Sequence, residues 1–188
     1  MIAPVSLLAR LILILALPNL ATAGVRTDWD PQRKVRGWLL DQEGLHLELR
    51  QIEPDRVRAF FEARGFSRPI QDRLARACVF QTVARNRGDR PLALDQHRWR
   101  LDDGRPPHLK EAWLPWLKGQ GAPKAARIAF RWATFPTRQV FAPGDYNWGL
   151  TLFDRPPGTR FALRLHWRQG GEDREATIRD MQCIPIAP

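Results

Sequence analysis

Hydrophobic and polar side chains alternate along residues 78–86, which is the period of a β-strand that buries one face. Residues 86–89, Asn-Arg-Gly-Asp, tolerate turn geometry, and leucine and tryptophan then recur from 92 to 101. We therefore expect residues 78–101 to form an antiparallel strand pair. Because such a pair is not stable alone in water, further strands must cover its apolar face, which predicts a β-sandwich.

Upstream of this pair, residues 37–52 carry a second alternating pattern. Leu45, Leu47 and Leu49 share one face, and the polar residues between them, including His46, share the other. The turn residues 41–44 precede this run, so we expect a β-hairpin. The segment 25–36 before it is polar and charged, and we expect it to be loosely held, with Trp29 as its one anchor.

Two short helices are expected between the hairpin and the strand at 78. The first starts with Pro54 in its first turn, where the missing N–H group costs nothing, and ends at Gly65. Ser67 is suited to cap the second, which we expect over 69–77. We expect this helical pair to pack over an open end or edge of the sheets.

The stretch after Leu101 is too long for a hairpin loop. Residues 108–118 have helical spacing interrupted at Pro115, so we expect a broken helix there. Strands resume at 127–133, where the side chains of Ile128, Phe130 and Trp132 alternate with polar or small ones.

A series of strands separated by turn residues covers residues 78 to 183. Its characteristic segments are a strand at 78–86 ending in Asn-x-Gly, residues 91–95, Asp103-Gly104, a strand and turn at 141–144, a strand at 149–153, and Pro157-Gly158 before 161–167. In this pattern the chain resembles the telokin-like, immunoglobulin-like extracytoplasmic domains of bacteria. The resemblance implies an all-β, immunoglobulin-like antiparallel β-sandwich at residues 78–188, preceded by an N-terminal extension at 24–77. It also implies a binding or assembly module.

The first 23 residues have the pattern of a secretory signal peptide. A short segment with one charge, Arg10, precedes the apolar run 11–17, and small residues at 21 and 23 suit cleavage after Ala23. The run is shorter than the roughly 20 residues that span a bilayer, which disfavours a membrane anchor. We therefore expect an exported, periplasmic protein.

The chain is strongly basic, with a net charge of +10 at pH 7 that falls to +9 when the segment holding Arg10 is removed. This charge favours a partner with an acidic surface. Basic charge is also typical of nucleic-acid-binding proteins, but an exported chain without a recognised nucleic-acid motif disfavours that class.

Two cysteines follow the signal peptide, Cys78 and Cys183. In an oxidising compartment we expect them to pair, and closing a loop of about 105 residues stabilises the fold by about 4 to 5 kcal/mol in the chain-entropy model. The alternative is a thiolate site, because Met181 and Cys183 are two residues apart on one side of a strand. Copper(I) favours such soft ligands.

Residues 145–149 form the most distinctive local sequence, Asp-Tyr-Asn-Trp-Gly. Tyrosine and tryptophan are enriched where surfaces bind partners, so Asp145, Tyr146, Asn147 and Trp148 are candidate binding residues. The alternative is that Trp148 fills the core and that Asn147 and Gly149 serve the backbone of the turn.

Trp113 and Trp116 are further candidates, because they lie among basic residues in the long insertion. Such a segment suits contact with a protein partner or peripheral contact with a membrane surface. The alternative is that both side chains fold back onto the sandwich.

No catalytic motif stands out. Ser67 is the one serine after the signal peptide and occupies a helix-cap position, and Asp102 and Asp103 are adjacent residues of a turn. We therefore expect a non-enzymatic accessory protein without a cofactor that docks onto another envelope protein or complex. The alternative is a copper carrier for a respiratory or oxidase enzyme that uses His97, His166, Met181 and, if unpaired, Cys183.

Overall fold

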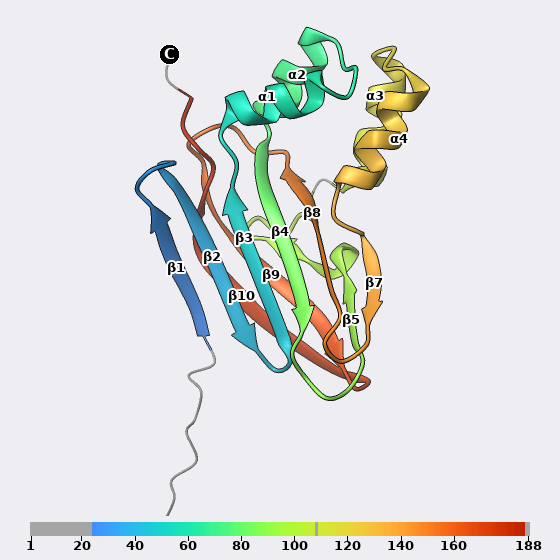
Figure 1. Cartoon of the computed structure of the whole chain (residues 1–188). Helices are drawn as coiled ribbons and strands as arrows, with labels where there is room; N and C mark the ends of the chain where they lie inside the picture. The colour runs from blue at the N-terminus through green and yellow to red at the C-terminus, as the bar shows by residue number, and fades with distance from the viewer. Residues whose placement is uncertain (1–23, 108, 187–188) are drawn as a thin grey trace, which may run out of the picture.

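A computed structural model describes residues 24–107 and 109–186, and within them ten strands form two antiparallel sheets (Figure 1). The predicted signal peptide, residues 1–23, lies outside the described residues. Four α-helices gather at one end of the sheets. The fold is therefore mixed, and the expectation of an all-β protein is wrong.

Sheet A has the strand order β1-β2-β3-β4-β8. Its strands are β1 (Gly24–Asp30), β2 (Val35–Gln42), β3 (Leu45–Gln51), β4 (Cys78–Asn86) and β8 (Tyr146–Phe153). The hairpin predicted around residues 41–44 is confirmed, because β2 pairs with β3 and the three leucines of β3 are buried. The residues expected as an N-terminal extension therefore supply three strands of this sheet.

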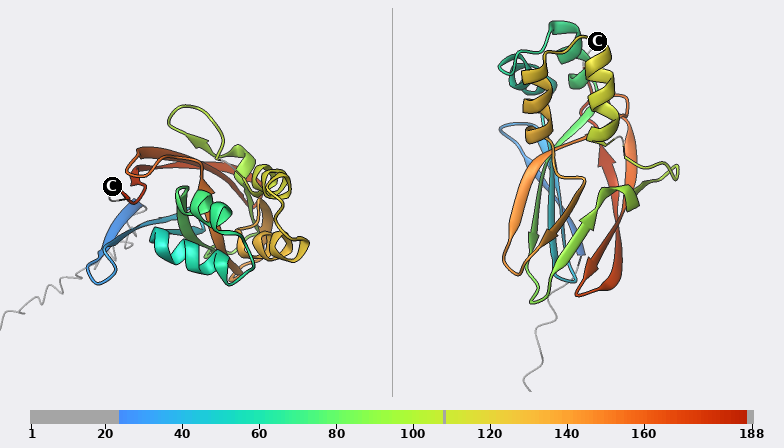
Figure 2. Two further views of the ribbon diagram at one scale, coloured as in Figure 1. Left: turned by 90° about the horizontal axis from the view of Figure 1, so that it is seen from above. Right: turned by 90° about the vertical axis from the view of Figure 1, so that its right-hand side faces the viewer.

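Sheet B has the order β10-β9-β5-β7, and a short strand β6 also pairs with β9. Its strands are β5 (Leu92–Asp95), β6 (Arg100–Leu101), β7 (Arg138–Phe141), β9 (Arg160–Gln169) and β10 (Glu172–Gln182), with a 3₁₀ turn η1 (Gln96–Arg98) between β5 and β6. The two sheets form two layers, seen along their edges in the right-hand view of Figure 2.

One apolar core fills the space between the layers. Its aromatic side chains meet edge to face, with ring centroids 5.8 Å apart for Trp38 and Phe80 and 5.5 Å apart for Phe80 and Phe153. Phe161 of sheet B joins them, 5.3 Å from Phe153. Large aromatic side chains bury about 150 to 250 Å² each, so this cluster is a major source of stability.

A second core lies between the outer face of sheet A and the helices α1 (Pro54–Glu62), α2 (Arg68–Ala75), α3 (Lys110–Gly119) and α4 (Lys124–Ala133). Phe61, Leu74 and Phe130 are fully buried there, against Leu150 and Leu152 of β8. The helices cover the end of sheet A where β4 begins and leave the other end open (Figures 1 and 2). The two predicted N-terminal helices are confirmed.

A disulfide joins Cys78, the first residue of β4, to Cys183, which follows β10. Because these strands belong to different sheets, the bond links the two layers across a sequence separation of 105 residues. The predicted pairing is confirmed, and it indicates an extracytoplasmic protein.

The strand pair predicted for 78–101 is wrong, because β4 and β5 belong to different sheets. The buried Asn86 explains the crossing. Its side-chain amide donates hydrogen bonds to the carbonyls of Arg90 and Phe141, at 2.8 and 3.1 Å, and its side-chain oxygen accepts one from the N–H of Gly88 at 2.9 Å. Phe141 ends β7, so Asn86 ties the end of β4 to the other layer.

The strand predicted for 127–133 is also wrong, because this segment lies in α4. The hydrophobic residues alternate in sequence because two different faces of the helix each carry some of them. Ala126 and Phe130 are four residues apart and buried, whereas Ile128 and Trp132 are four residues apart and exposed. The helix starts with Lys-Ala-Ala-Arg, which are strong helix formers.

The segment 25–36 is more ordered than predicted. Residues 24–30 form β1, which pairs with β2 along its whole length. Trp29 is not an anchor, since 52% of its surface is exposed.

Candidate functional site

A tight turn leads into β8 and sets the position of its first residues. The carboxylate of Asp145 accepts a hydrogen bond from the N–H of Ala142 at 2.9 Å, and the carbonyl of Asp145 accepts one from the N–H of Asn86 at 2.9 Å. Gly144 occupies the left-handed backbone region, with φ of 85°, which glycine adopts without strain. Asp145 therefore holds the turn, although it is itself exposed.

Tyr146 and Trp148 lie two residues apart on β8 and project from the outer face of sheet A. Each exposes 59% of its surface. Val83 and Arg85 of β4 are their cross-strand partners, and the Arg85 guanidinium lies 5.1 Å from the centre of the Tyr146 ring. This is a cation–π contact, so the two aromatic rings form a surface with a positive charge beside it.

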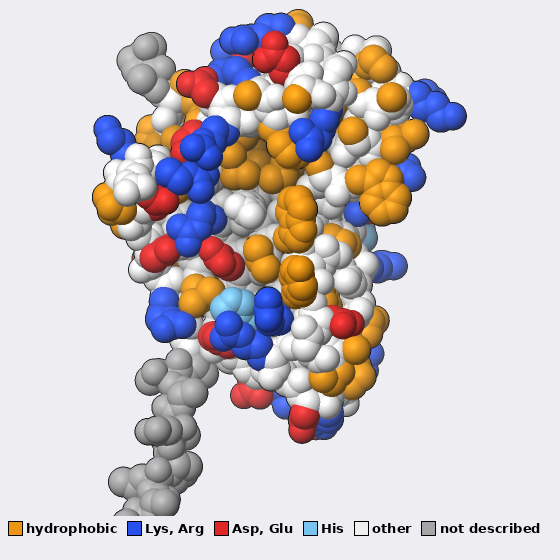
Figure 3. Space-filling view, in the orientation of Figure 1, with side chains coloured by type: hydrophobic (Ala, Val, Ile, Leu, Met, Phe, Trp, Pro, Cys, Tyr) orange, Lys and Arg blue, Asp and Glu red, His pale blue; other side chains and the backbone are white. Residues whose placement is uncertain are grey.

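Trp132 extends this surface from α4 and is the most exposed large apolar side chain described, at 82%. A pocket of about 370 Å³ lies between α4 and β8, and we call it the aromatic pocket. Its lining residues are Lys110, Arg131, Trp132, Thr134, Pro136, Asn147 and Trp148. Figure 3 shows hydrophobic side chains over β8 and at the edge below α4, with charged ones nearer β1.

The backbone fixes the positions of Trp132 and Trp148 around the aromatic pocket. The connection from α4 to β7 lies against β8, where the N–H of Phe135 donates to the carbonyl of Leu150 at 2.9 Å. This close approach requires Gly149, because a Cβ atom there would lie 2.5 Å from the Phe135 nitrogen. Gly149 therefore serves the backbone, but within β8 at the contact with this connection and not in the turn.

Asn147 is engaged inside the protein. Its side-chain amide donates to the side-chain oxygen of Gln139 at 2.7 Å, and its own oxygen accepts the N–H of Trp148 at 2.7 Å. Gln139 belongs to β7, so Asn147 ties the edge strands of the two sheets together. Of the four candidates at 145–148, Tyr146 and Trp148 are thus the ones that present a free face.

Two cations border the aromatic pocket, Lys110 and Arg131. The pKa of Lys110 is lowered, mainly by its partial burial and also by the nearby Arg131, while Glu111 opposes the shift. Glu111 is itself held by the hydroxyl of Thr137, which donates to both carboxylate oxygens at 2.7 and 2.9 Å. A partly desolvated ammonium favours an anionic partner, because the anion replaces the interactions with water that burial has removed.

The tryptophans of the long insertion take a different position. Trp113 is 2% exposed and packs in the second core, and Trp116 is half-buried against it with ring centroids 5.6 Å apart. The Arg73 guanidinium lies 5.0 Å from the Trp113 ring centre. Trp113 therefore cannot contact a partner, and the side chains fold back onto the protein.

The residues considered for copper are not brought together. Met181 is fully buried between the sheets, and Cys183 is in the disulfide. His166 lies on the outer face of sheet B, 3.8 Å from Glu175, and His97 lies 2.9 Å from Asp95. Across residues 24–107 and 109–186, no group of three or more histidine, cysteine, aspartate and glutamate side chains could hold a metal ion.

The adjacent carboxylates Asp102 and Asp103 serve the turn after β6. Hydrogen bonds from Arg105 lower the pKa of Asp103 to about 2, and Arg155 adds to the effect. Arg155 also lies 3.4 Å from Asp102. Both acids are paired with arginines, so their role is to stabilise this turn.

Sequence reasoning missed Trp132, the most exposed member of the site, because it was assigned to a strand. The available signal was the spacing of four residues between Ala126 and Phe130, which places Trp132 off the buried face of a helix.

No family model matches the chain, and neither a curated protein nor a solved structure matches it. In the described part of the chain, none of the helices is long and apolar enough to cross a membrane.

Proposed function

We propose that this is a non-enzymatic docking module of the bacterial envelope, which binds a segment of another envelope protein at the aromatic pocket. The observation that carries the proposal is that Trp132 and Trp148, both mostly exposed, line one pocket together with Lys110 and Arg131. Tryptophan and arginine are the residues that most often dominate binding energy at protein interfaces.

The chemistry of the pocket specifies the partner segment. An apolar side chain of the partner fits between the indole rings, and an acidic side chain pairs with Lys110 or Arg131. The net charge, +10 for the full chain and +9 without the segment that holds Arg10, steers an acidic surface toward the protein and raises the association rate. The partner is therefore a segment that combines acidic and large apolar residues.

Recognition takes place through side chains and not through strand addition. β8 is an edge strand of sheet A, but the N–H of Trp148 is used by Asn147 and the carbonyl of Leu150 by Phe135. These internal bonds remove groups that an added strand would need. The edge also carries bulky exposed rings, which suits insertion of a side chain into the pocket.

Three features support the location and type of this module. The disulfide is typical of an oxidising compartment, and the predicted signal peptide provides the route to it. Two antiparallel sheets around one core agree with the coarse features of an immunoglobulin-like binding domain, and we include that kinship, with periplasmic localisation, in the proposal.

The test is site-specific photocrosslinking in intact cells from position 132, compared with position 29. Trp29 is a matched control because it is also an exposed tryptophan, at 52%, but lies on β1 at the opposite edge of sheet A. A protein that is crosslinked from position 132 but not from position 29 is then purified and titrated against the full chain.

Trp148→Ala is expected to weaken this binding by about 2 kcal/mol, which is about thirtyfold in Kd, while Trp29→Ala leaves it unchanged. Equal losses in both variants would overturn the proposal. Crosslinking to lipid alone from position 132, with binding to anionic vesicles that Trp148→Ala removes, would replace the protein partner by a membrane surface.

A further inference from the structure

The outer face of sheet B is rich in arginine because of the alternation along β9. Side chains at 161, 163, 165 and 167 are buried in the core, so those between them face solvent. The outward side chains of β9 are Arg160, Ala162, Arg164, His166 and Arg168. This face lies on the other side of the protein from the aromatic pocket.

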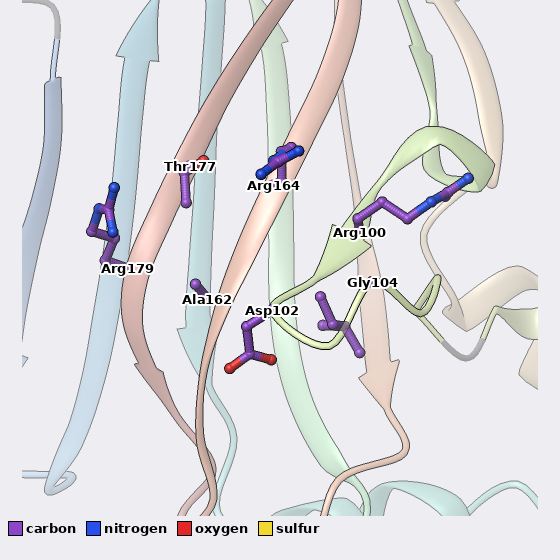
Figure 4. Close-up of a pocket in the computed structure, with 8 residues that line it drawn as sticks. Arg100, Asp102, Gly104, Ala162, Arg164, Thr177 and Arg179 are labelled. Carbon is purple, nitrogen blue, oxygen red and sulfur yellow. The ribbon is translucent and has the colours of Figure 1, made fainter.

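A hollow of about 480 Å³ lies on this face, and we call it the arginine hollow (Figure 4). Its floor is low because Ala162 is small, and Arg164 and Thr177 are cross-strand neighbours beside it. The pairing of β10 with β9 shifts register between Ile178 and Met181, and this bulge contains Arg179. In Figure 4, Thr177 and Ala162 lie between Arg179 and Arg164.

The arginines of the hollow are not neutralised by acidic side chains. In the part of the chain that the structure describes, neither Arg164 nor Arg179 forms an ion pair, whereas Arg98 pairs with Asp173 at 2.6 Å on the same face. Arg100 donates hydrogen bonds to two backbone carbonyls, those of His97 and Trp99. The hollow thus holds positive charge that no internal partner compensates.

The register of the sheet makes this charge costly. Arg100 and Arg164 stand directly opposite each other on β6 and β9, and like charges at such positions destabilise a sheet. Figure 4 shows the Arg100 guanidinium turned away from Arg164. An anion in the hollow would relieve the repulsion, which is a physical reason for binding that does not depend on the number of arginines.

The one acidic side chain at the rim, Asp102, is already occupied. Its carboxylate lies 3.4 Å from the Arg155 guanidinium, which also contacts Asp103 at 2.8 Å. Arg155 therefore offsets the charge of Asp102 and leaves Arg164 and Arg179 available.

We propose that the arginine hollow binds a phosphate group, as a phosphomonoester or as inorganic phosphate. Planar guanidinium groups match the oxygens of a phosphate in bidentate geometry, and such charge-assisted hydrogen bonds are among the strongest in proteins. Arg164 and Arg179 bind the phosphate oxygens from two strands, and the Thr177 hydroxyl donates a third hydrogen bond between them. Arg100 contributes charge without direct contact.

The experiment is a calorimetric titration of the full mature chain with inorganic phosphate at constant ionic strength, with chloride as the reference anion. We expect one site with a Kd of about 1 mM. Arg164→Gln and Arg179→Gln each weaken binding by about tenfold or more. Arg160→Gln is the matched control, since Arg160 lies on the same strand and face but outside the hollow, and it changes Kd by less than about twofold.

Melting temperatures provide a second readout that does not depend on the ligand. Without phosphate, Arg164→Gln raises the melting temperature by about 1 to 3 °C, because it removes the like-charge pair. At the same phosphate concentration, phosphate raises the melting temperature of the wild type more than that of this variant. If Arg164→Gln does not fold, Arg179→Gln carries the same titration.

The proposal is overturned if phosphate does not bind, or if Arg160→Gln loses as much affinity as Arg164→Gln, since that pattern is general charge screening. The source of the phosphate is distinguished with vesicles of phosphatidic acid in phosphatidylcholine, compared with phosphatidylcholine alone. Sedimentation with the phosphatidic acid vesicles that Arg164→Gln abolishes supports a lipid headgroup. Titration of inorganic phosphate without vesicle binding supports a free anion.

Discussion

The outer faces of the two sheets are built by the same alternation of side chains but differ at their candidate sites, where sheet A exposes aromatic rings and sheet B exposes arginines. Sheet A is covered by helices at one end, and beyond them Tyr146 and Trp148 are exposed. Sheet B carries arginines along β9. The exposed aromatic rings suit an apolar ligand and the unpaired arginines suit an anion, so the two proposals concern two different kinds of ligand.

The two faces also differ in how well they are expected to tolerate substitution. The arginines of the hollow project outward from strands β6, β9 and β10, so their replacement removes no side chain from the core. The aromatic pocket depends on a contact between α4, its following connection and β8. The first site is expected to tolerate substitution, and the second is expected to be sensitive to shifts of a helix.

The largest expected effect is a loss of stability when the disulfide that links the two sheets is removed. Replacing Cys78 and Cys183 together by serine should lower the free energy of unfolding by about 4 to 5 kcal/mol, because the unfolded chain is no longer constrained. Urea unfolding of the variant against the oxidised wild type measures this. An unchanged midpoint would show that packing alone joins the layers.

Next in size is the contrast between a buried and an exposed tryptophan on the helices. Trp113→Ala should cost about 3 to 5 kcal/mol, because it leaves a cavity in the second core, whereas Trp132→Ala should change stability by less than about 0.5 kcal/mol. Denaturation of the two variants side by side decides this. A similar loss in both would show that Trp132 supports the fold, and it would weaken the docking proposal.

Gly149→Ala should affect the aromatic pocket and leave the arginine hollow unchanged. The added methyl group meets the backbone of Phe135, so we expect a loss of about 1 to 3 kcal/mol and displacement of α4 from β8. Partner binding at the aromatic pocket should weaken, while phosphate binding at the arginine hollow is retained. Gly119→Ala is the control, because a Cβ atom there meets nothing within 4 Å.

If phosphate binding falls in parallel with partner binding in Gly149→Ala, the two faces are coupled and do not act as separate sites.

The smallest effect concerns the turn beside the arginine hollow. Hydrogen bonds from Arg105 lower the pKa of Asp103 to about 2, below the value of about 3.9 for an unfolded chain. The folded state binds fewer protons in this range, so the contribution is present above about pH 4 and is lost as the pH falls toward 2. Asp103→Asn should therefore reduce the fall in melting temperature between pH 5 and about pH 2.

An acid sensitivity identical to that of the wild type would show that Asp103 contributes nothing to stability.

The sequence was sufficient to predict an element where one hydrophobic period dominates the segment. Leu45, Leu47 and Leu49 alternate without interruption, so the strand and its buried face follow directly. The disulfide was predictable because two cysteines allow a single pairing. In α4, by contrast, Ile128 and Trp132 are apolar although exposed, and the surplus hydrophobic residues imitate the alternation of a strand.

The candidate site was predictable in part for the same reason. Trp148 lies in a strand with a clear period, but whether its face meets solvent depends on where the helices end on sheet A. That boundary is set by tertiary packing of Phe130 and Leu150, which are 20 residues apart in the numbering and belong to different elements. The arginine hollow depends on the register of β6 against β9, which the pattern of side chains does not specify.

The disulfide also has a consequence for the order in which the chain can mature. Cys78 belongs to the fourth strand, and its partner Cys183 follows the tenth. During this interval the first thiol has no competing cysteine with which to form a wrong bond. The bond between Cys78 and Cys183 can therefore form only after every strand of both sheets is present, so it marks a chain whose ten strands are complete.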